Sequence, residues 1–137
     1  MMAEVQQSSD VTYRIYDYDR KDANGNMREL HIEKAIKVTN IPHIELDVHP
    51  TVTMLEGNEV IEYVNEKYFS VIRYKIQNEI QINNPSYSLC LPLSGSGILH
   101  IDGKDYDIQV GIGFIITSHT KRYSIQGNIN LLVSVPK

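Results

Sequence analysis

The chain has 137 residues, of which 42% are hydrophobic, and carries a formal net charge of −4, so it is long enough for one core or for one domain with part of a second. The acidic balance argues against a general nucleic-acid surface, which gains affinity from many phosphate-facing cations. A single cysteine excludes an intramolecular disulfide, and no apolar run approaches the roughly 20 residues of a membrane helix, so we expect a cytoplasmic protein that binds no membrane.

Two arginines and several tyrosines share one face of a strand that is expected near the N-terminus. The residues from Gln6 to Arg20 read QQSSDVTYRIYDYDR. Guanidinium groups match phosphate oxygens in pairs, and tyrosines add rings and hydroxyl donors, so the face is typical of a sugar-phosphate surface. Alternatively, these arginines belong to a solvated edge strand and pair with Asp10, Asp17 and Asp19. Because side chains alternate along an extended chain, the shared face would carry Thr12, Arg14, Tyr16, Tyr18 and Arg20.

A turn and a helix are expected next. The Asn-Gly-Asn run at 24–26 supplies a turn and a candidate N-cap. An imperfect apolar stripe, with Glu33 four residues before Lys37, predicts a helix over the segment RELHIEKA. The helix should end near Thr39, because the residue before Pro42 is biased away from helical angles. The stripe consists of Met27, Leu30, Ile32, Ala35 and Ile36.

From Ile44 onward, short runs rich in Ile, Val and Tyr alternate with turn residues. This spacing predicts an all-β sandwich or barrel. Asp102-Gly103 is the strongest hairpin signal, because a type I′ turn needs positive φ at both central residues. Cys90 is expected to be a small buried hydrophobe, and the SGSG run at 94–97 a tight turn. The runs are EVIEYV, YFSVIRYKI, EIQI, YSLCLPL, GILHI, KDYDI, GFIIT, RYSI and INLLVSV.

The string QQSSDVTYRIYDYDR, followed by DANGNMRELHIEKA, closely resembles a segment of bacterial type I mannose-6-phosphate isomerases. The resemblance is strong from Glu4 to about His43 and continues more weakly through YFSVIRYKI, SGSGILHIDGK and GFIITSHTKRYSIQG. In that family the arginine of this motif acts in the active site beside the sugar phosphate, which implies a catalytic role for Arg14. A basic residue follows six positions later, which implies that Arg20 binds or steers the phosphate of a hexose 6-phosphate.

The resemblance also implies how the chain is divided. Residues 1–43 would be a remnant of the catalytic region, and residues 44–137 a C-terminal cupin-like domain. We therefore expect a mainly β fold, a cupin-like jelly roll preceded by a strand and one short α-helix. Compared with cupins, Thr117 stands about where proline is usual and Tyr123 near the place of a late metal ligand, so this jelly roll is expected to bind no metal.

The histidines show no metal-binding pattern. A zinc site needs three or four converging ligands, usually with two from a short local motif, and the sequence has no H-x-H, HExxH or CxxC string. We predict no metal site and no cofactor in this chain, although the resemblance implies zinc in the full-length family, held on strands that precede the QQS segment. His31 is expected to pack the helix against the strand that carries Arg14. The histidines are His31, His43, His49, His100 and His119.

Two functions remain open at this point. In the first, the chain is the C-terminal portion of a mannose-6-phosphate isomerase, lacks the zinc ligands and is inactive or nearly so alone. The family reaction interconverts mannose 6-phosphate and fructose 6-phosphate through a cis-enediol(ate), whose negative oxygen needs a cation nearby. In the second, the chain is a non-catalytic jelly roll that binds a sugar phosphate or a protein. Its exposed N-terminal strand would then offer an edge for a homodimer.

Overall fold

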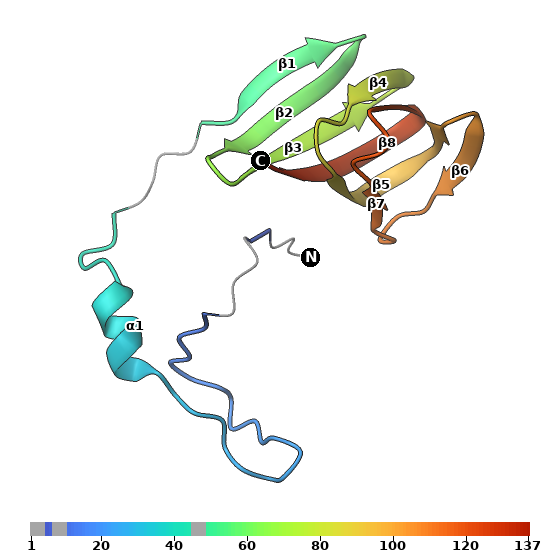
Figure 1. The fold of residues 1–137 in the computed structure, drawn as a ribbon. Coiled ribbons are helices and arrows are strands. Elements are labelled where there is room, and N and C mark those ends of the chain that lie inside the picture. Colours follow the sequence, from blue (N-terminus) through green and yellow to red (C-terminus); the bar gives the residue numbers. More distant parts are fainter. Residues whose placement is uncertain (1–4, 7–10, 45–48) are drawn as a thin grey trace. The chain divides into compact units, whose positions relative to one another are not determined.

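The computed structural model describes residues 5–6, 11–44 and 49–137 (Figure 1). The chain divides into two compact units, one made of Ser8–Asp47 and the other of Met1–Gln7 with Val48–Lys137. In the described residues the first unit holds one helix, α1 (Ile32–Val38), and the second holds eight strands. The predicted mainly β fold is confirmed. None of the helical residues that the structure describes forms a segment long and apolar enough to cross a membrane.

All strand pairs of the larger unit are antiparallel, and two strands are much longer than the others. The first part of β5 pairs with β7 and the end of β8, whereas its last part pairs with β6 and the start of β8. The strands are β1 (Thr51–Leu55), β2 (Asn58–Asn65), β3 (Phe69–Ile76), β4 (Glu79–Asn83), β5 (Ser88–Ile101), β6 (Lys104–Ile108), β7 (Phe114–Ile116) and β8 (Arg122–Pro136).

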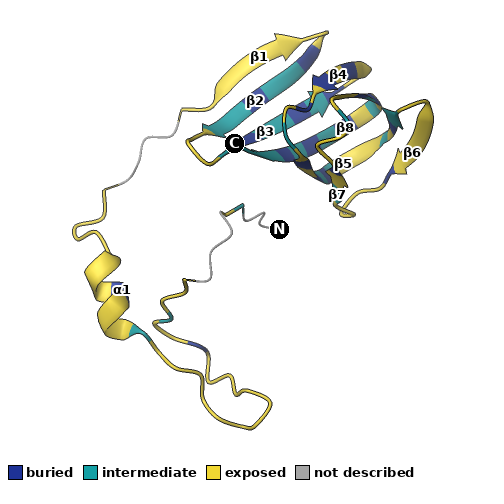
Figure 2. Cartoon of the chain, in the orientation of Figure 1, coloured by how far each residue is buried: buried dark blue, intermediate teal, exposed yellow. Residues whose placement is uncertain are grey.

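The two long strands create two layers. We call the layer β1-β2-β3-β8-β5-β7 sheet I and the layer β4-β8-β5-β6 sheet II, because β5 and β8 pass from one to the other. Alternate residues of both layers are buried between them, as the dark blue bands on the strands show (Figure 2). Such a double sheet is the arrangement of a jelly roll. The fully buried aliphatic side chains include Ile76, Ile80, Ile116, Ile125, Ile129, Leu131 and Val133.

Glycines allow β5 and β8 to approach each other where they leave one sheet for the other. A Cβ atom on Gly95, whose φ is +87°, would lie 2.0 Å from the Asn128 carbonyl oxygen. A Cβ atom on Gly127 would lie 2.4 Å from the carbonyl oxygen of Ser96. The prediction of a tight turn at 94–97 is therefore wrong, because these small residues bend β5 without ending it.

Two hairpin turns have positive φ at both central residues. Asp102 and Gly103 have φ of 50° and 73° and join β5 to β6, which confirms the predicted hairpin. Glu56 and Gly57, with φ of 51° and 78°, join β1 to β2 in the same way. Strand β1 was not predicted from the sequence, and each of its residues is exposed.

The crossing of β5 and β8 makes Gly95 intolerant of a side chain. We expect Gly95→Ala to lower the free energy of unfolding by about 2 kcal/mol, because alanine must adopt positive φ and its methyl group meets backbone. Urea denaturation checks this. Gly113→Ala is the control, since a Cβ atom there would meet only an ordinary contact at 3.5 Å. Equal stability of the two variants would contradict the interpretation of the crossing.

Candidate functional site

The arginine-bearing segment of the smaller unit is not a strand. Tyr18 and Asp19 adopt left-handed φ values of 52° and 54°, and the Arg20 amide donates to the Asp17 carbonyl at 3.0 Å. This turn interrupts the alternation of side chains between Arg14 and Arg20. The predicted strand, and with it the shared face of arginines and tyrosines, is therefore wrong for residues 11–20, whereas residues 7–10 of the predicted segment lie outside the described residues.

Helix α1 is shorter than the sequence predicts at its start. His31 is its N-cap and makes no side-chain capping bond, while the end at Val38, with Thr39 as C-cap, confirms the prediction. The residues before His31 are held by other bonds, because the His31 amide donates to the Arg14 carbonyl at 2.6 Å. The turn at 24–26 forms but does not cap the helix. It closes on the Asp22 carboxylate, which accepts from the amides of the residues two and four positions later.

Arg14 is fixed by both its backbone and its guanidinium group. The Arg14 amide donates to His31 Nδ1 at 3.2 Å, and Arg14 Nη1 donates to the Glu29 carbonyl at 3.0 Å. Its Nε lies 3.5 Å from Asp17 Oδ1, and 21% of the side chain is exposed. His31 thus contacts the Arg14 segment as expected. Arg14 is partly shielded yet still reaches solvent, which suits a cation that meets a small anion.

The Asp17 carboxylate contacts two arginines of the smaller unit, Arg14 and Arg28. Arg28 binds it in a bidentate ion pair, with hydrogen bonds from Nε to Oδ2 at 2.6 Å and from Nη2 to Oδ1 at 2.5 Å. The Arg28 hydrogen bond is the main cause that lowers the pKa of Asp17, and the nearby charges of Arg28, Arg14 and Arg20 add to it. Arg28 was not predicted from the sequence as a site residue. Its position within the recognised family segment was the signal that could have drawn attention to it.

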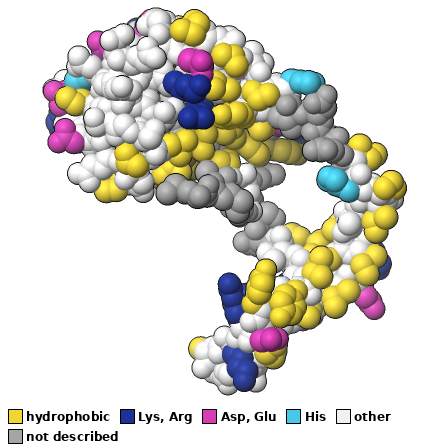
Figure 3. Space-filling model, turned by 180° about the vertical axis from the view of Figure 1, so that it is seen from behind, with side chains coloured by type: hydrophobic (Ala, Val, Ile, Leu, Met, Phe, Trp, Pro, Cys, Tyr) yellow, Lys and Arg dark blue, Asp and Glu magenta, His cyan; other side chains and the backbone are white. Residues whose placement is uncertain are grey.

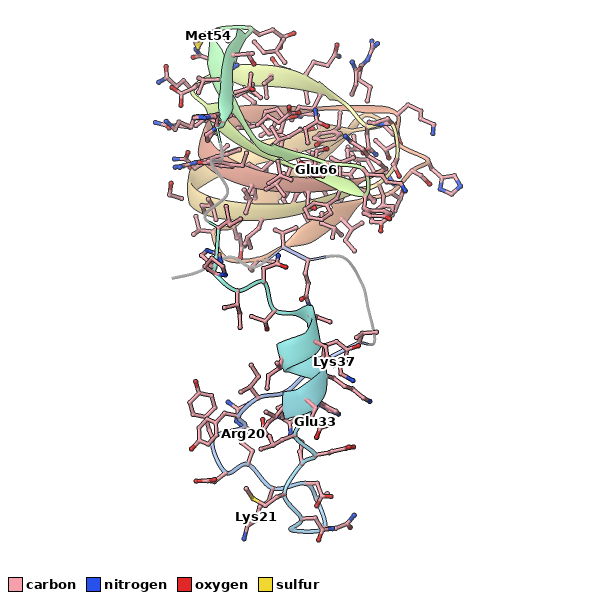
Figure 4. All side chains as sticks on the ribbon, turned by 90° about the vertical axis from the view of Figure 1, so that its left-hand side faces the viewer. Arg20, Lys21, Glu33, Lys37, Met54 and Glu66 are labelled. Carbon is pink, nitrogen blue, oxygen red and sulfur yellow. The ribbon has the colours of Figure 1, made fainter. Side chains whose placement is uncertain are left out.

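The Arg20 side chain takes no part in the ion pair between Arg28 and Asp17. Its guanidinium carbon is 5.9 Å from the ring centroid of Tyr18, and that ring meets Tyr16 edge-on at 5.1 Å. Arg20, Tyr16 and Tyr18 are all exposed. Figure 4 shows Arg20 and Lys21 on the loop that precedes α1. The structure therefore gives the two predicted arginines different surroundings, one partly enclosed beside Asp17 and one exposed on an aromatic pair.

The described residues do not fit zinc. Among them, no group of three or more His, Cys, Asp or Glu side chains is close enough to share a metal ion. His100 and Asp105 form a pair, in which His100 Nδ1 lies 2.6 Å from Asp105 Oδ1 across the β5-β6 hairpin. That hydrogen bond raises the pKa of His100. Two ligands are fewer than a zinc site requires.

The interior of the jelly roll holds three weakly acidic groups instead. Cys90 is buried, as predicted, and burial raises the pKa of its thiol to about 12. Burial also raises the pKa of Tyr74 to about 12 and raises that of Tyr123. The Tyr123 hydroxyl is buried without a hydrogen-bond partner among the described residues. Tyr123 is therefore a residue of the hydrophobic core.

Comparison with solved structures gives the class of the larger unit. It is a jelly roll of the cupin class. A nucleoside dehydratase, Pac13, shares the fold with a TM-score of 0.58 at 14% identity over 68% of this chain and 82% of that chain. A closer match is the crystal structure of mannose 6-phosphate isomerase from Bacillus subtilis, with a TM-score of 0.78 and 34% identity over 92% of this chain and 40% of that chain.

The sequence comparisons then give the family. The chain belongs to the mannose-6-phosphate isomerase cupin-domain family, whose model matches residues 59–136. It is 41% identical to the probable mannose-6-phosphate isomerase GmuF of Bacillus subtilis over 99% of the chain and 44% of that protein. It is 33% identical to the mannose-6-phosphate isomerase of Streptococcus mutans over 98% of the chain and 42% of that protein. The family resemblance is confirmed, and the chain spans less than half the length of these relatives.

The ion pair between Arg28 and Asp17 predicts which arginine has the largest effect on the pKa of Asp17. In a carbon-detected NMR titration, Asp17 should protonate below the ordinary pKa of 3.8, and Arg28→Gln should move that pKa upward. Arg20→Gln is the control and should move it little, because the charge of Arg20 is the weakest of the causes. The stabilisation that Asp17 provides is present above its unfolded pKa and is lost as pH falls through its lower folded pKa. A larger shift in Arg20→Gln would contradict this arrangement.

The unpartnered hydroxyl of Tyr123 predicts a stabilising substitution. Tyr123→Phe should raise the free energy of unfolding by about 1 kcal/mol, because the buried hydroxyl lies near Ser88 and Cys90 yet makes no hydrogen bond of normal distance and angle with either. Urea denaturation followed by circular dichroism measures the change. Ser88→Ala is the opposite case, since the Ser88 hydroxyl donates to Asn84 Oδ1 at 2.7 Å and its loss should destabilise the fold. A destabilised Tyr123→Phe variant would refute the prediction.

Proposed function

We propose that this chain is the C-terminal portion of a mannose-6-phosphate isomerase and supplies Arg14 to its active site. Residues 1–43 would be the part that belongs to the catalytic region, and residues 44–137 the cupin-like domain. The observation that carries the proposal is the 41% identity to an isomerase relative over 99% of the chain, because this match includes the arginine-bearing segment. The protein would act in the cytoplasm on a hexose 6-phosphate.

Arg14 would stabilise charge during the reaction. Interconversion of mannose 6-phosphate and fructose 6-phosphate moves a proton between C2 and C1, and the cis-enediolate formed on the way carries negative charge on oxygen. A guanidinium held in place by the Glu29 carbonyl and by Asp17 needs little rearrangement to meet that oxygen. Only one of its bonds is to a charged group, at 3.5 Å, so hydrogen-bonding capacity remains for a substrate.

Arg20 would bind the phosphate. Its exposure and its position on the Tyr18 ring leave the planar fork of donors accessible to a phosphate group. The described residues offer no ligand set for the zinc that the resemblance implies for the full-length family. We therefore propose that the chain alone is inactive or nearly so.

A coupled assay of fructose 6-phosphate formation tests the proposal. The purified chain should show no turnover with or without added zinc. The complementary portion is the part of the Bacillus subtilis relative GmuF that this chain does not match. A mixture of the chain with this portion, supplied with zinc, should show turnover. Robust activity that is proportional to the chain alone would refute the expected inactivity, and an inactive mixture would count against the assignment to the isomerase.

The two arginines should differ in the active mixture. Arg14→Lys should lower kcat by about 100-fold, because lysine cannot keep both the Glu29 and the Asp17 contacts while it faces the reacting oxygen. Arg20→Gln should mainly raise KM, because it weakens phosphate binding. Lys34→Gln, on helix α1, serves as a charge control that should leave both constants unchanged. If Arg14→Lys retained full kcat, Arg14 would not act on the reacting oxygens.

Calorimetry with fructose 6-phosphate tests the alternative that the chain is a non-catalytic jelly roll which binds a sugar phosphate. Should the chain bind fructose 6-phosphate alone, with the heat lost in Arg14→Ala, the segment recognises the sugar phosphate without the rest of an enzyme. Should no heat appear in either form, the isolated chain has no sugar-phosphate site.

A further inference from the structure

Sheet I carries large apolar side chains on both of its faces, whereas sheet II carries them mainly on the face that meets the core. Residues that are paired across antiparallel strands point to the same face, so the strand registers show which side chains share the outer face, away from the core. On sheet II the outer face is mainly polar, as expected for a sheet that is solvated on one side. It carries Glu79, Gln126, Ile98 and Asp107 in one row and Gln81, Ser124, His100 and Asp105 in the next.

The outer face of sheet I has two apolar rows. This pattern is typical of strands that are covered on both sides. Ile61 and Val71 are each only 8% exposed although neither belongs to the core cluster between the sheets. One row is Val52, Ile61, Arg73, Leu132 and Leu91. The other is Val64, Val71, Ser134, Leu89 and Ile115.

Large side chains in these rows remain exposed. Ile115 is 62% exposed, Val52 is 59% exposed and Leu89 is 44% exposed. Figure 4 shows Met54, which is also exposed, on β1 at the edge of the sheet. In Figure 3, which views the molecule from behind, hydrophobic side chains gather beside a group of basic ones. An exposed apolar area of this kind, on a regular sheet, marks an interaction surface.

Polar contacts border the apolar rows on one side. Lys75 forms an ion pair with Glu59 across β2 and β3. Arg73 is the one charged member of the first row, and its Nε donates to Asn130 Oδ1 of the bordering row at 3.2 Å. Asn130 Nδ2 in turn donates to Ser94 Oγ at 3.0 Å. An apolar centre with a hydrogen-bonded polar rim is the usual composition of a protein interface.

Two described residues near the start of the chain lie at this same surface. Val5 and Gln6 line a pocket of about 570 Å³ together with Leu89, Ile115 and Leu132 of the apolar rows. In a longer isomerase of which this chain is the C-terminal portion, the preceding polypeptide would enter beside the exposed rows. A segment tethered so close has a high effective concentration there, which favours it over a second copy of the chain.

We propose that the outer face of sheet I is the docking surface for the remaining portion of the isomerase, the part of its relatives' length that this chain does not match. The inference rests on the proposed function. The relatives are more than twice as long as the matched region, since the chain covers 44% of one and 42% of another. Their additional length is ample to cover two rows of a six-stranded layer.

Thiol labelling tests this surface directly. Cys90 is 3% exposed, so in Ile115→Cys the new thiol is the one that a maleimide reaches in the folded chain. On addition of the complementary portion of the Bacillus subtilis relative, its labelling rate should fall at least about tenfold. Ile98→Cys is the matched control, because Ile98 is 37% exposed on the outer face of sheet II and its rate should not change. Equal protection of both thiols, or of neither, would overturn the proposal.

A fusion covers the case in which the complementary portion does not fold separately. When the chain is joined to that portion in one polypeptide, the Ile115→Cys thiol should again react at least about tenfold more slowly than in the chain alone. An unchanged rate in the fusion would overturn the proposal. Protection in the chain alone that grows with its concentration would also overturn it, in favour of a second copy as the occupant.

Introducing positive charge into the apolar rows gives an independent measurement. The double variant Leu89→Lys/Ile115→Lys should bind the complementary portion at least about tenfold more weakly, while Ile98→Lys should bind like wild type. Thermal melting of each variant alone verifies that it is folded. Protection of Ile115→Cys without turnover in the mixture would support docking and count against the catalytic proposal. Turnover without protection would do the reverse.

Discussion

The close passage of β5 and β8 is the constraint on which the larger unit depends. These two strands pair with each other along most of their length and also provide the partners for β3, β4, β6 and β7. The passage is possible because Gly95 and Gly127 present no side chain where each meets the other strand's backbone. The pairing of β5 with β8 therefore fixes how the strands of both layers are aligned. The core side chains of each sheet face those of the other.

The sequence predicted the parts of this fold that rest on local chemistry. The Asp102-Gly103 turn, the end of the helix at Thr39 and the burial of Cys90 all follow from short-range signals and are confirmed. The glycine-rich run in β5 resembles a turn in sequence, because only the presence of β8 shows that glycines there allow close approach of two strands. Strand β1 has no buried residue, so its pattern contained no sign of a core-facing strand.

The candidate site was predictable in its residues and not in its conformation. The alternation of Arg14, Tyr16, Tyr18 and Arg20 indicates a strand, but hydrogen bonds to Asp17 bend the segment into a turn. Partners far along the chain decide this outcome, because Asp17 is held by a guanidinium eleven residues away. Other bonds, made with Arg14, explain why the helix starts late, since the Glu29 carbonyl accepts from the Arg14 guanidinium and the amide of His31, the N-cap, donates to the Arg14 carbonyl. Arg14 and Arg20 remain candidates whose roles depend on the proposed reaction.

Strand β1 has a further consequence for the dynamics of the jelly roll. It is hydrogen-bonded to β2 alone, all of its side chains are exposed, and its other edge has no paired strand among the described residues. Its amide protons should therefore exchange with solvent by local fraying that leaves the interior intact, at a far lower free energy than global unfolding. The margin of the sandwich thus behaves as a separate, weakly stable foldon, whose order any neighbour that covered it would increase.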